Sequence, residues 1–246
     1  MSYIENPKTK GSGIICAIPQ EGLCPQKCPD CFFQSGRSYL EPLEENLPNV
    51  PSVEEAKGMV IRMNDGNDSN VKRDVVEKCA EQFEDAFFNT SFPARIADYP
   101  GPVVLTLNPS GMTDDGFHVI DPVPPNLMYV RVRVNTWNVR SVLEPAVRYY
   151  TEGDNPWGKV PVVMTYMAYY GEGLREDHKR FYEFKKRTLN SYWVLTDHAR
   201  KGIEKMFEDN PYVHSCGHKG THSCSQCGNC LREYFATKVR LNKLGG

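Results

Sequence analysis

The chain has 246 residues, of which 40% are apolar, and a formal net charge of −2. This length allows one domain with a sizeable core, since α/β barrels of similar length form single domains. Mixed acidic and basic residues give no basic face, which leaves nucleic-acid binding open but unsupported. No apolar run reaches the ~18 residues of a membrane helix, and the N-terminus lacks an apolar leader. We therefore expect a cytoplasmic protein without a membrane partner.

Six short runs rich in branched aliphatic, methionine or aromatic residues predict buried parallel strands. They cover residues 13–18, 58–63, 85–89, 102–107, 127–134 and 160–168. Helical spacing predicts helices over 71–83, 139–150, 175–186 and 196–207. The expected fold is α/β, a partial (βα)6 TIM-like barrel over residues 1–208, followed by a short cysteine-rich metal-binding extension over 209–246.

Nine cysteines are present, and seven of them fall in two tight clusters. Such clustering is typical of metal sites in a reducing compartment and not of a secreted disulfide framework. The other two, Cys16 and Cys79, lie in apolar or helical runs and are expected to be packing residues.

The first cluster follows the first predicted strand and reads Cys24-Pro-Gln-Lys-Cys28-Pro-Asp-Cys31. A 4Fe-4S cluster takes one ligand per iron, so three cysteines leave one iron open, whereas structural zinc is closed by four ligands. The triad therefore favours an open cluster. The alternative is a zinc knuckle that Cys16 completes.

A C-x3-C-x2-C motif after a first strand resembles the radical S-adenosylmethionine (SAM) superfamily, and the resemblance covers about residues 13–170. It implies that Cys24, Cys28 and Cys31 hold a 4Fe-4S cluster whose free iron chelates the amino and carboxylate groups of SAM. It further implies an electron donor such as ferredoxin or flavodoxin, and a 5′-deoxyadenosyl radical that takes hydrogen from the substrate. One departure is Asp30, which stands where the superfamily usually has an aromatic residue, with Phe32 and Phe33 following.

Polar residues at the ends of the later strands are expected to contact SAM, because ligands of α/β barrels gather there. The second strand runs into Asp65-Gly66-Asn67-Asp68, which looks like a variant of the superfamily's Gly-Gly-Glu motif with Asp68 as the acid. A plain Asp/Asn/Gly turn is the alternative. The resemblance assigns the ribose contacts to Thr106 and Asn108, and the SAM carboxylate or adenine to Arg131, Arg133 and Asn135. It places the sixth strand, at Thr165 and Tyr166, beside the adenine, with backbone groups making the contacts.

Arg131, Arg133 and Asn135 alternate with apolar residues and therefore project to one side of the fifth strand. If that side were exposed, the arginines would only keep the strand soluble. No catalytic side chain is assigned.

The second cluster consists of Cys216, Cys224, Cys227 and Cys230, at spacings of eight, three and three. Four thiolates can fully ligate one metal centre, either zinc or an iron-sulfur cluster, and nearby histidines keep mixed zinc sites open. Many members of the superfamily carry a C-terminal auxiliary cluster, so the resemblance favours a second 4Fe-4S cluster, with zinc as the alternative.

Three functions are consistent with these patterns. The first is a radical SAM enzyme that acts on a peptide or a small metabolite. The second applies the same chemistry to a nucleotide or RNA. The third is a non-catalytic binding module with two zinc ions.

Overall fold

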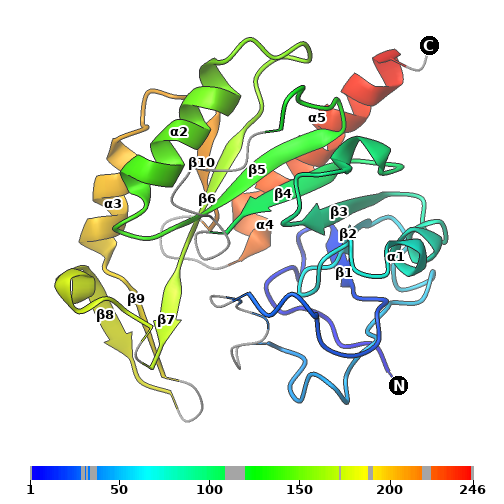
Figure 1. Cartoon of the computed structure of the whole chain (residues 1–246). Helices are drawn as coiled ribbons and strands as arrows, with labels where there is room; N and C mark the ends of the chain where they lie inside the picture. Colours follow the sequence, from blue (N-terminus) through cyan, green and yellow to red (C-terminus); the bar gives the residue numbers. More distant parts are fainter. Residues whose placement is uncertain are drawn as a thin grey trace.

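The computed structural model describes residues 2–28, 31, 33, 38–108, 120–171, 173–187, 191–217 and 223–244. Its centre is a seven-stranded parallel sheet, curled into a half-barrel, with strand order β1-β2-β3-β4-β5-β6-β10 (Figure 1). The strands are Ile14–Ala17, Val60–Met63, Ala86–Thr90, Val103–Leu107, Leu127–Val134, Val162–Tyr166 and Val213–Ser215. The expected α/β architecture with a barrel-like parallel sheet is confirmed.

Each of the six predicted runs overlaps one strand of this sheet, and most of their residues are buried. The seventh strand, β10, was not predicted and comes from the segment expected as an extension. It pairs in parallel with β6, where Val162 N donates to Tyr212 O and Cys216 N donates to Met164 O. Only three partly buried residues form β10, too few for a visible pattern.

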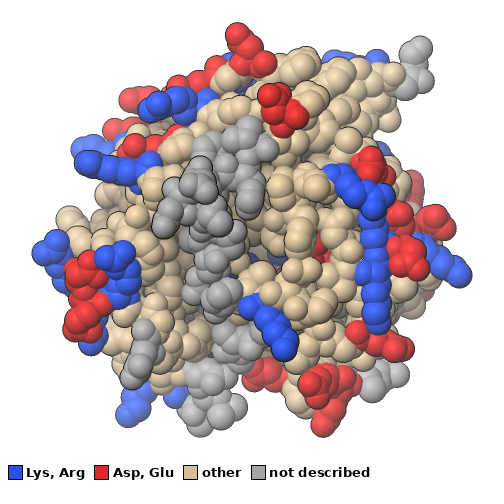
Figure 2. Space-filling model, in the orientation of Figure 1, with Lys and Arg blue, Asp and Glu red and all other residues tan. Residues whose placement is uncertain are grey.

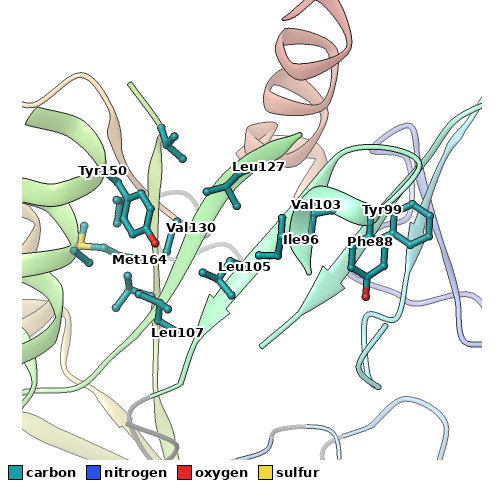
Figure 3. Packing of buried hydrophobic residues seen from close by; sticks show 14 of the residues in the cluster. Phe88, Ile96, Tyr99, Val103, Leu105, Leu107, Leu127, Val130, Tyr150 and Met164 are labelled. Carbon is teal, nitrogen blue, oxygen red and sulfur yellow. The ribbon is translucent and has the colours of Figure 1, made fainter. Parts of the chain in front are cut away.

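Three helical segments cover the outer face of the sheet. They are α1 (Arg73–Ala80), an irregular stretch around α2 (Glu144–Val147), and α3 (Asp197–Lys205). The predicted helix over 139–150 is present, but π-helical turns over Val139–Leu143 and Arg148–Glu152 flank its α-helical centre. Figure 3 shows Leu105 and Val130 projecting from β4 and β5 into the main apolar core, which also contains Tyr150.

The prediction of a helix over residues 175–186 is wrong. Residues Glu176–Phe181 form a 3-10 helix, and Tyr182–Lys185 form strand β8. This strand lies in a small antiparallel sheet of order β7-β9-β8 with Ala168–Tyr170 and Tyr192–Leu195. Tyr182 is buried against Tyr169 and Trp137, so packing against the rest of the molecule overrides the helical spacing.

The last helix, α5 (Asn229–Leu244), packs on the inner face of the half-barrel, towards the amino ends of the strands. Tyr234 is buried there among side chains from six strands, at Ile14, Val60, Phe87, Val104, Tyr129 and Val163. Its hydroxyl donates to Asp85 Oδ1 at 2.7 Å, and Arg240 donates to the carbonyls of Pro125 and Leu127. The helix therefore fills one end of the interior.

The opposite end of the interior lies at the carboxyl edge of the sheet. The segment after β1 and the small β7-β9-β8 sheet both extend beyond this edge (Figure 1). Among the described helices, none combines the length and apolar character that crossing a bilayer requires.

Candidate functional site

Cys24, Cys28 and Cys31 lie on the loop after β1, beyond the carboxyl edge of the sheet. Cys24 is buried and the other two are partly buried, and Cys31 N donates to Cys28 O at 3.0 Å. Burial raises the pKa of Cys24 and Cys28, and the neighbouring thiols and the Asp68 carboxylate raise it further. The structure thus brings the three predicted thiols into electrostatic range of one another and of Asp68.

The donor atoms do not yet form a coordination shell. Among the described side chains, no group of three or more thiol, imidazole or carboxylate groups is arranged so that it could hold a metal ion. Asp30 and Phe32, in and beside the motif, lie outside the described residues, as do His218 and His222 near the second cluster.

The Asp68 carboxylate ties the loop after β2 to the end of β3. Its Oδ1 accepts hydrogen bonds from Asn70 N and Thr90 Oγ1, at 2.9 and 2.8 Å. Its Oδ2 accepts from Ser91 N and Ser91 Oγ, at 2.7 and 2.9 Å. A carboxylate has about four acceptor positions, so this side chain is fully occupied.

Gly66 provides space for the aromatic ring that follows the cysteine triad. A Cβ atom at this position would lie 2.2 Å from Cδ2 of Phe33, so only glycine fits beneath the ring. On either side, Asp65 Oδ2 accepts from Asn6 Nδ2 at 2.6 Å, and Asn67 Oδ1 accepts from the backbone of Asp68. The Asp65–Asp68 segment therefore shapes the loop through its packing and its turn geometry.

The two arginines of β5 project into the half-barrel, so the alternative of an exposed strand face is wrong. Arg131 is 9% exposed, and its Nη2 donates to Tyr129 OH at 2.9 Å. Its Nη1 lies 3.3 Å from Asn89 Oδ1 and 3.5 Å from Thr106 Oγ1. Thr106 and Arg131 therefore lie side by side inside the half-barrel, where Arg131 is engaged by protein side chains.

Arg133 lies one pleat further along β5, towards the cysteine triad. Burial lowers its pKa to about 10, and the charge of Arg131 acts in the same direction. Cys31 and Cys28 oppose this shift, so the guanidinium lies within electrostatic range of the triad thiols. The two arginines are grouped together in the sequence, but their side chains lie in different environments.

The remaining predicted SAM contacts are Asn135, Tyr166, Asn108 and Thr165. Asn135 shapes a turn, since its Oδ1 accepts from the backbone N–H groups of Trp137 and Asn138 and its Nδ2 donates to Tyr169 OH. Tyr166 packs against the outer core, and its hydroxyl lies 3.4 Å from Ser215 Oγ. The other two positions, Asn108 and Thr165, lie near the carboxyl ends of β4 and β6, where Thr165 Oγ1 is buried without a hydrogen-bond partner among the described residues.

The four C-terminal cysteines gather near the inner face of the half-barrel. Cys216 follows β10, Cys224 and Cys227 begin and end α4 (Cys224–Cys227), and Cys230 lies in the first turn of α5. A hydrogen bond from the Cys216 thiol lowers the pKa of Cys227 to about 6, and the Sγ of Cys230 lies 3.0 Å from Tyr129 OH. The spacing prediction therefore groups side chains that lie near one another in the fold.

Sequence reasoning missed Arg62, Tyr129 and Asn89, which line the same interior. Arg62 interrupts the apolar strand Val60–Met63, and a charged residue in a buried strand is a signal that could have drawn attention to it. Tyr129 shares the period of two with Arg131, but its partner Cys230 is 101 positions away in the chain.

The chain matches no family model, curated protein or solved structure. The side chains of the site are therefore the basis on which a function can be proposed.

Proposed function

We propose that this chain is a radical SAM enzyme in which Cys24, Cys28 and Cys31 hold a 4Fe-4S cluster and leave one iron for SAM. The observation that carries the proposal is the position of three thiols on one loop beyond the carboxyl edge of a half-barrel, within electrostatic range of one another and of the buried Arg133 guanidinium. The all-thiol donor set fits an iron-sulfur cluster, because soft sulfur ligands select such clusters. When bound, the cluster supplies one electron for reductive cleavage of SAM to a 5′-deoxyadenosyl radical.

Arg133 is the side chain best suited to bind the SAM carboxylate. Its guanidinium is buried, faces Cys28 and Cys31, and lies beside the like charge of Arg131. An incoming carboxylate would relieve that repulsion and form charge-assisted hydrogen bonds with the guanidinium. Asp68, whose acceptor positions are filled, acts instead as a positioning residue for the loop.

An apolar cluster shelters the triad from water. It consists of Ile18, Phe33, Leu40 and Leu47, and Cys31 packs against it. Exclusion of water protects a reactive carbon radical from side reactions. Both the cluster and Gly66, beneath the Phe33 ring, therefore serve the proposed chemistry.

The surface supports a small metabolite or peptide as the substrate. Figure 2 shows Lys and Arg interspersed with Asp and Glu around the face drawn there. A polyanion such as RNA is bound mainly through contiguous positive charge, which this face does not display.

The same proposal includes a second metal centre on the C-terminal cysteines, Cys216, Cys224, Cys227 and Cys230. It is supported by the Cys216–Cys227 hydrogen bond and by the proximity of Cys216, Cys224 and Cys230 to the same two arginines, Arg62 and Arg131. A 4Fe-4S cluster is the favoured occupant and zinc the alternative.

The test is anaerobic reconstitution with iron and sulfide, followed by SAM and dithionite, with 5′-deoxyadenosine as the product measured. The wild-type chain should form it, and Cys28→Ala should not. Cys79→Ala is the matched control, because Cys79 lies on α1 in the outer core and should leave the reaction intact. Product formation by a chain lacking all three triad cysteines would overturn the proposal.

A further inference from the structure

We infer that Arg62 and Arg131 are the counter-charges of a thiolate metal centre formed by Cys216, Cys224, Cys227 and Cys230 inside the half-barrel, with Tyr129 donating a hydrogen bond to it. This inference rests on the proposed second metal centre and is independent of SAM cleavage.

The two arginines create a charge that the interior must balance. Arg62 projects inward from β2, and its Nε is buried without a hydrogen-bond partner among the described residues. Arg131 projects inward from β5, and each guanidinium lies within electrostatic range of the other. Buried cations are costly unless anions accompany them. Two like charges in one interior therefore call for nearby anions.

Most of the groups near these arginines that could carry a negative charge are thiols. The acidic neighbours of Arg62 are Asp65, Tyr129 and the thiols of Cys16 and Cys230. Those of Arg131 are Tyr129 and the thiols of Cys230 and Cys216. Cys224 in turn has both arginines as electrostatic neighbours. The Asp65 carboxylate compensates part of the positive charge beside Arg62, but no carboxylate is among the described neighbours of Arg131, where thiolates bound to a metal would supply negative charge.

A directed chain of hydrogen bonds points the same way. Arg131 Nη2 donates to Tyr129 OH at 2.9 Å, so the phenol oxygen acts as an acceptor there. The phenol proton is then available for Cys230 Sγ, 3.0 Å away. Such a relay stabilises negative charge on the sulfur, as outer-shell donors do for metal ligands.

The charge of the proposed centre is opposite in sign to the charges of the two arginines. Four thiolates around a divalent zinc ion leave two negative charges, and an oxidised 4Fe-4S cluster with four thiolates leaves the same number. Arg62 and Arg131 supply two positive charges. The structure therefore associates Arg131 with the C-terminal thiols, while Arg133 faces the triad.

The test uses the full-length chain with Cys24→Ser, Cys28→Ser and Cys31→Ser, stripped of metal and titrated with Co²⁺ without oxygen. Cobalt bound to thiolates absorbs strongly through sulfur-to-metal charge transfer, which gives affinity and ligand type in one measurement. We expect this absorption to appear in the triad-free chain and to be weakened or shifted by Cys227→Ser.

The arginine variants are made in the triad-free background. Arg62→Gln with Arg131→Gln should weaken Co²⁺ binding by about tenfold or more, the usual effect of losing outer-shell partners. Arg131→Lys retains the positive charge, so this variant should keep most of the Co²⁺ affinity of the triad-free chain. Tyr129→Phe should shift the charge-transfer band to lower energy, since the sulfur loses a hydrogen bond. The matched control is Arg240→Gln, because Arg240 is a partly buried arginine that donates to backbone carbonyls and should leave the affinity unchanged.

The outcomes separate the proposals. Unchanged Co²⁺ affinity in the double arginine variant, or an equal loss in Arg240→Gln, overturns the counter-charge role. No thiolate absorption in the triad-free chain overturns the C-terminal centre itself. Neither result affects SAM cleavage by the triad, which is measured separately through 5′-deoxyadenosine.

Discussion

Four hydrogen bonds converge on the carboxylate of Asp68, and they join the loop after β2 to the start of the segment after β3. This side chain is 6% exposed. A buried carboxylate that accepts from backbone N–H groups stabilises the fold, and each such charged hydrogen bond contributes about 2 kcal/mol. A structural role and a ligand role for Asp68 therefore predict different phenotypes.

Asp68→Asn should lower thermal stability and SAM affinity together, because the Asn amide group would face the Ser91 N–H, donor against donor. We expect a loss of about 2 kcal/mol in unfolding free energy. Chemical denaturation and equilibrium dialysis with SAM measure the two effects. The control is Asp98→Asn, whose exposed ion pair with Arg95 should contribute little. Full stability with lost SAM binding would instead identify Asp68 as a direct ligand.

Gly66→Ala should disturb the triad loop, because the new Cβ would overlap the Phe33 ring. We expect reduced iron incorporation during reconstitution, measured as iron per chain. Phe33→Ala in the same chain should restore part of that loading, since it removes the overlapping ring.

Gly202→Ala is the matched glycine control. Nothing lies within 4 Å of the added Cβ, and the position is in the middle of α3. It should raise the unfolding free energy by about 0.5–1 kcal/mol without altering iron loading. Equal iron loss in both glycine variants would contradict a specific contact between Gly66 and Phe33.

At the scale of elements, the contacts that dock α5 include an ion pair that responds to pH. Asp85 accepts from Lys238 and Tyr234 of α5, and the hydrogen bond from Lys238 chiefly holds its pKa below the usual value. A depressed carboxyl pKa adds stability above the unfolded-state value near 4, and this stability is lost as pH falls through the folded-state pKa.

Asp85→Asn should therefore reduce stability at pH 7 by about 1 kcal/mol, the size expected for a partly exposed pair. It should also flatten the dependence of unfolding free energy on pH below about 4. Urea unfolding at several pH values measures both changes, and Lys238→Gln should reproduce them. An unchanged pH profile in Asp85→Asn would show that the pair does not stabilise the docked helix.

The start of α3 offers a second test at this scale. Thr196 Oγ1 accepts from Ala199 N at 3.2 Å, the geometry of a helix N-cap. Thr196→Ala should cost about 1 kcal/mol in unfolding free energy, and Thr196→Ser should retain most of it. Equal stability of the two variants in urea would contradict the capping role.

The sequence predicted elements well where local pattern and burial agree. The strand over Leu127–Val134 was predicted with its observed bounds, because four apolar residues followed by alternation of arginine and valine are visible in the sequence itself. The prediction of a helix over 175–186 failed because Tyr182 lies in a sheet and packs against Tyr169 and Trp137. These contacts are not visible in the local sequence pattern. The helix α5 was missed, since its segment was read only for its cysteines.

The candidate site was likewise predicted where the signal is local and missed where it depends on distant contacts. Regular cysteine spacing identified both thiol groups, because such spacing is visible in the chain itself. Arg62 and Tyr129 were not identified, since their importance depends on which strand faces point inward and on contacts with distant segments.

At the scale of the whole molecule, the half-barrel has two differently occupied ends. Towards the amino ends of the strands, α5 fills the interior around Tyr234. Towards the carboxyl edge lie the cysteine triad loop, Arg133 and the small antiparallel sheet. The C-terminal thiols are near arginines that lie between these ends. This arrangement places both proposed metal centres along one interior.

The contacts of α5 also bear on the order of assembly. Tyr234 bonds to Asp85 across 149 positions of sequence, and Cys224 N donates to the carbonyl of Lys8, near the first strand. Contacts this distant in sequence form late, because closing large loops is entropically slow. Until α5 docks, the interior is open to solvent and to any machinery that delivers metal. Delivery of the proposed clusters would then be limited to the time before the last helix closes the interior.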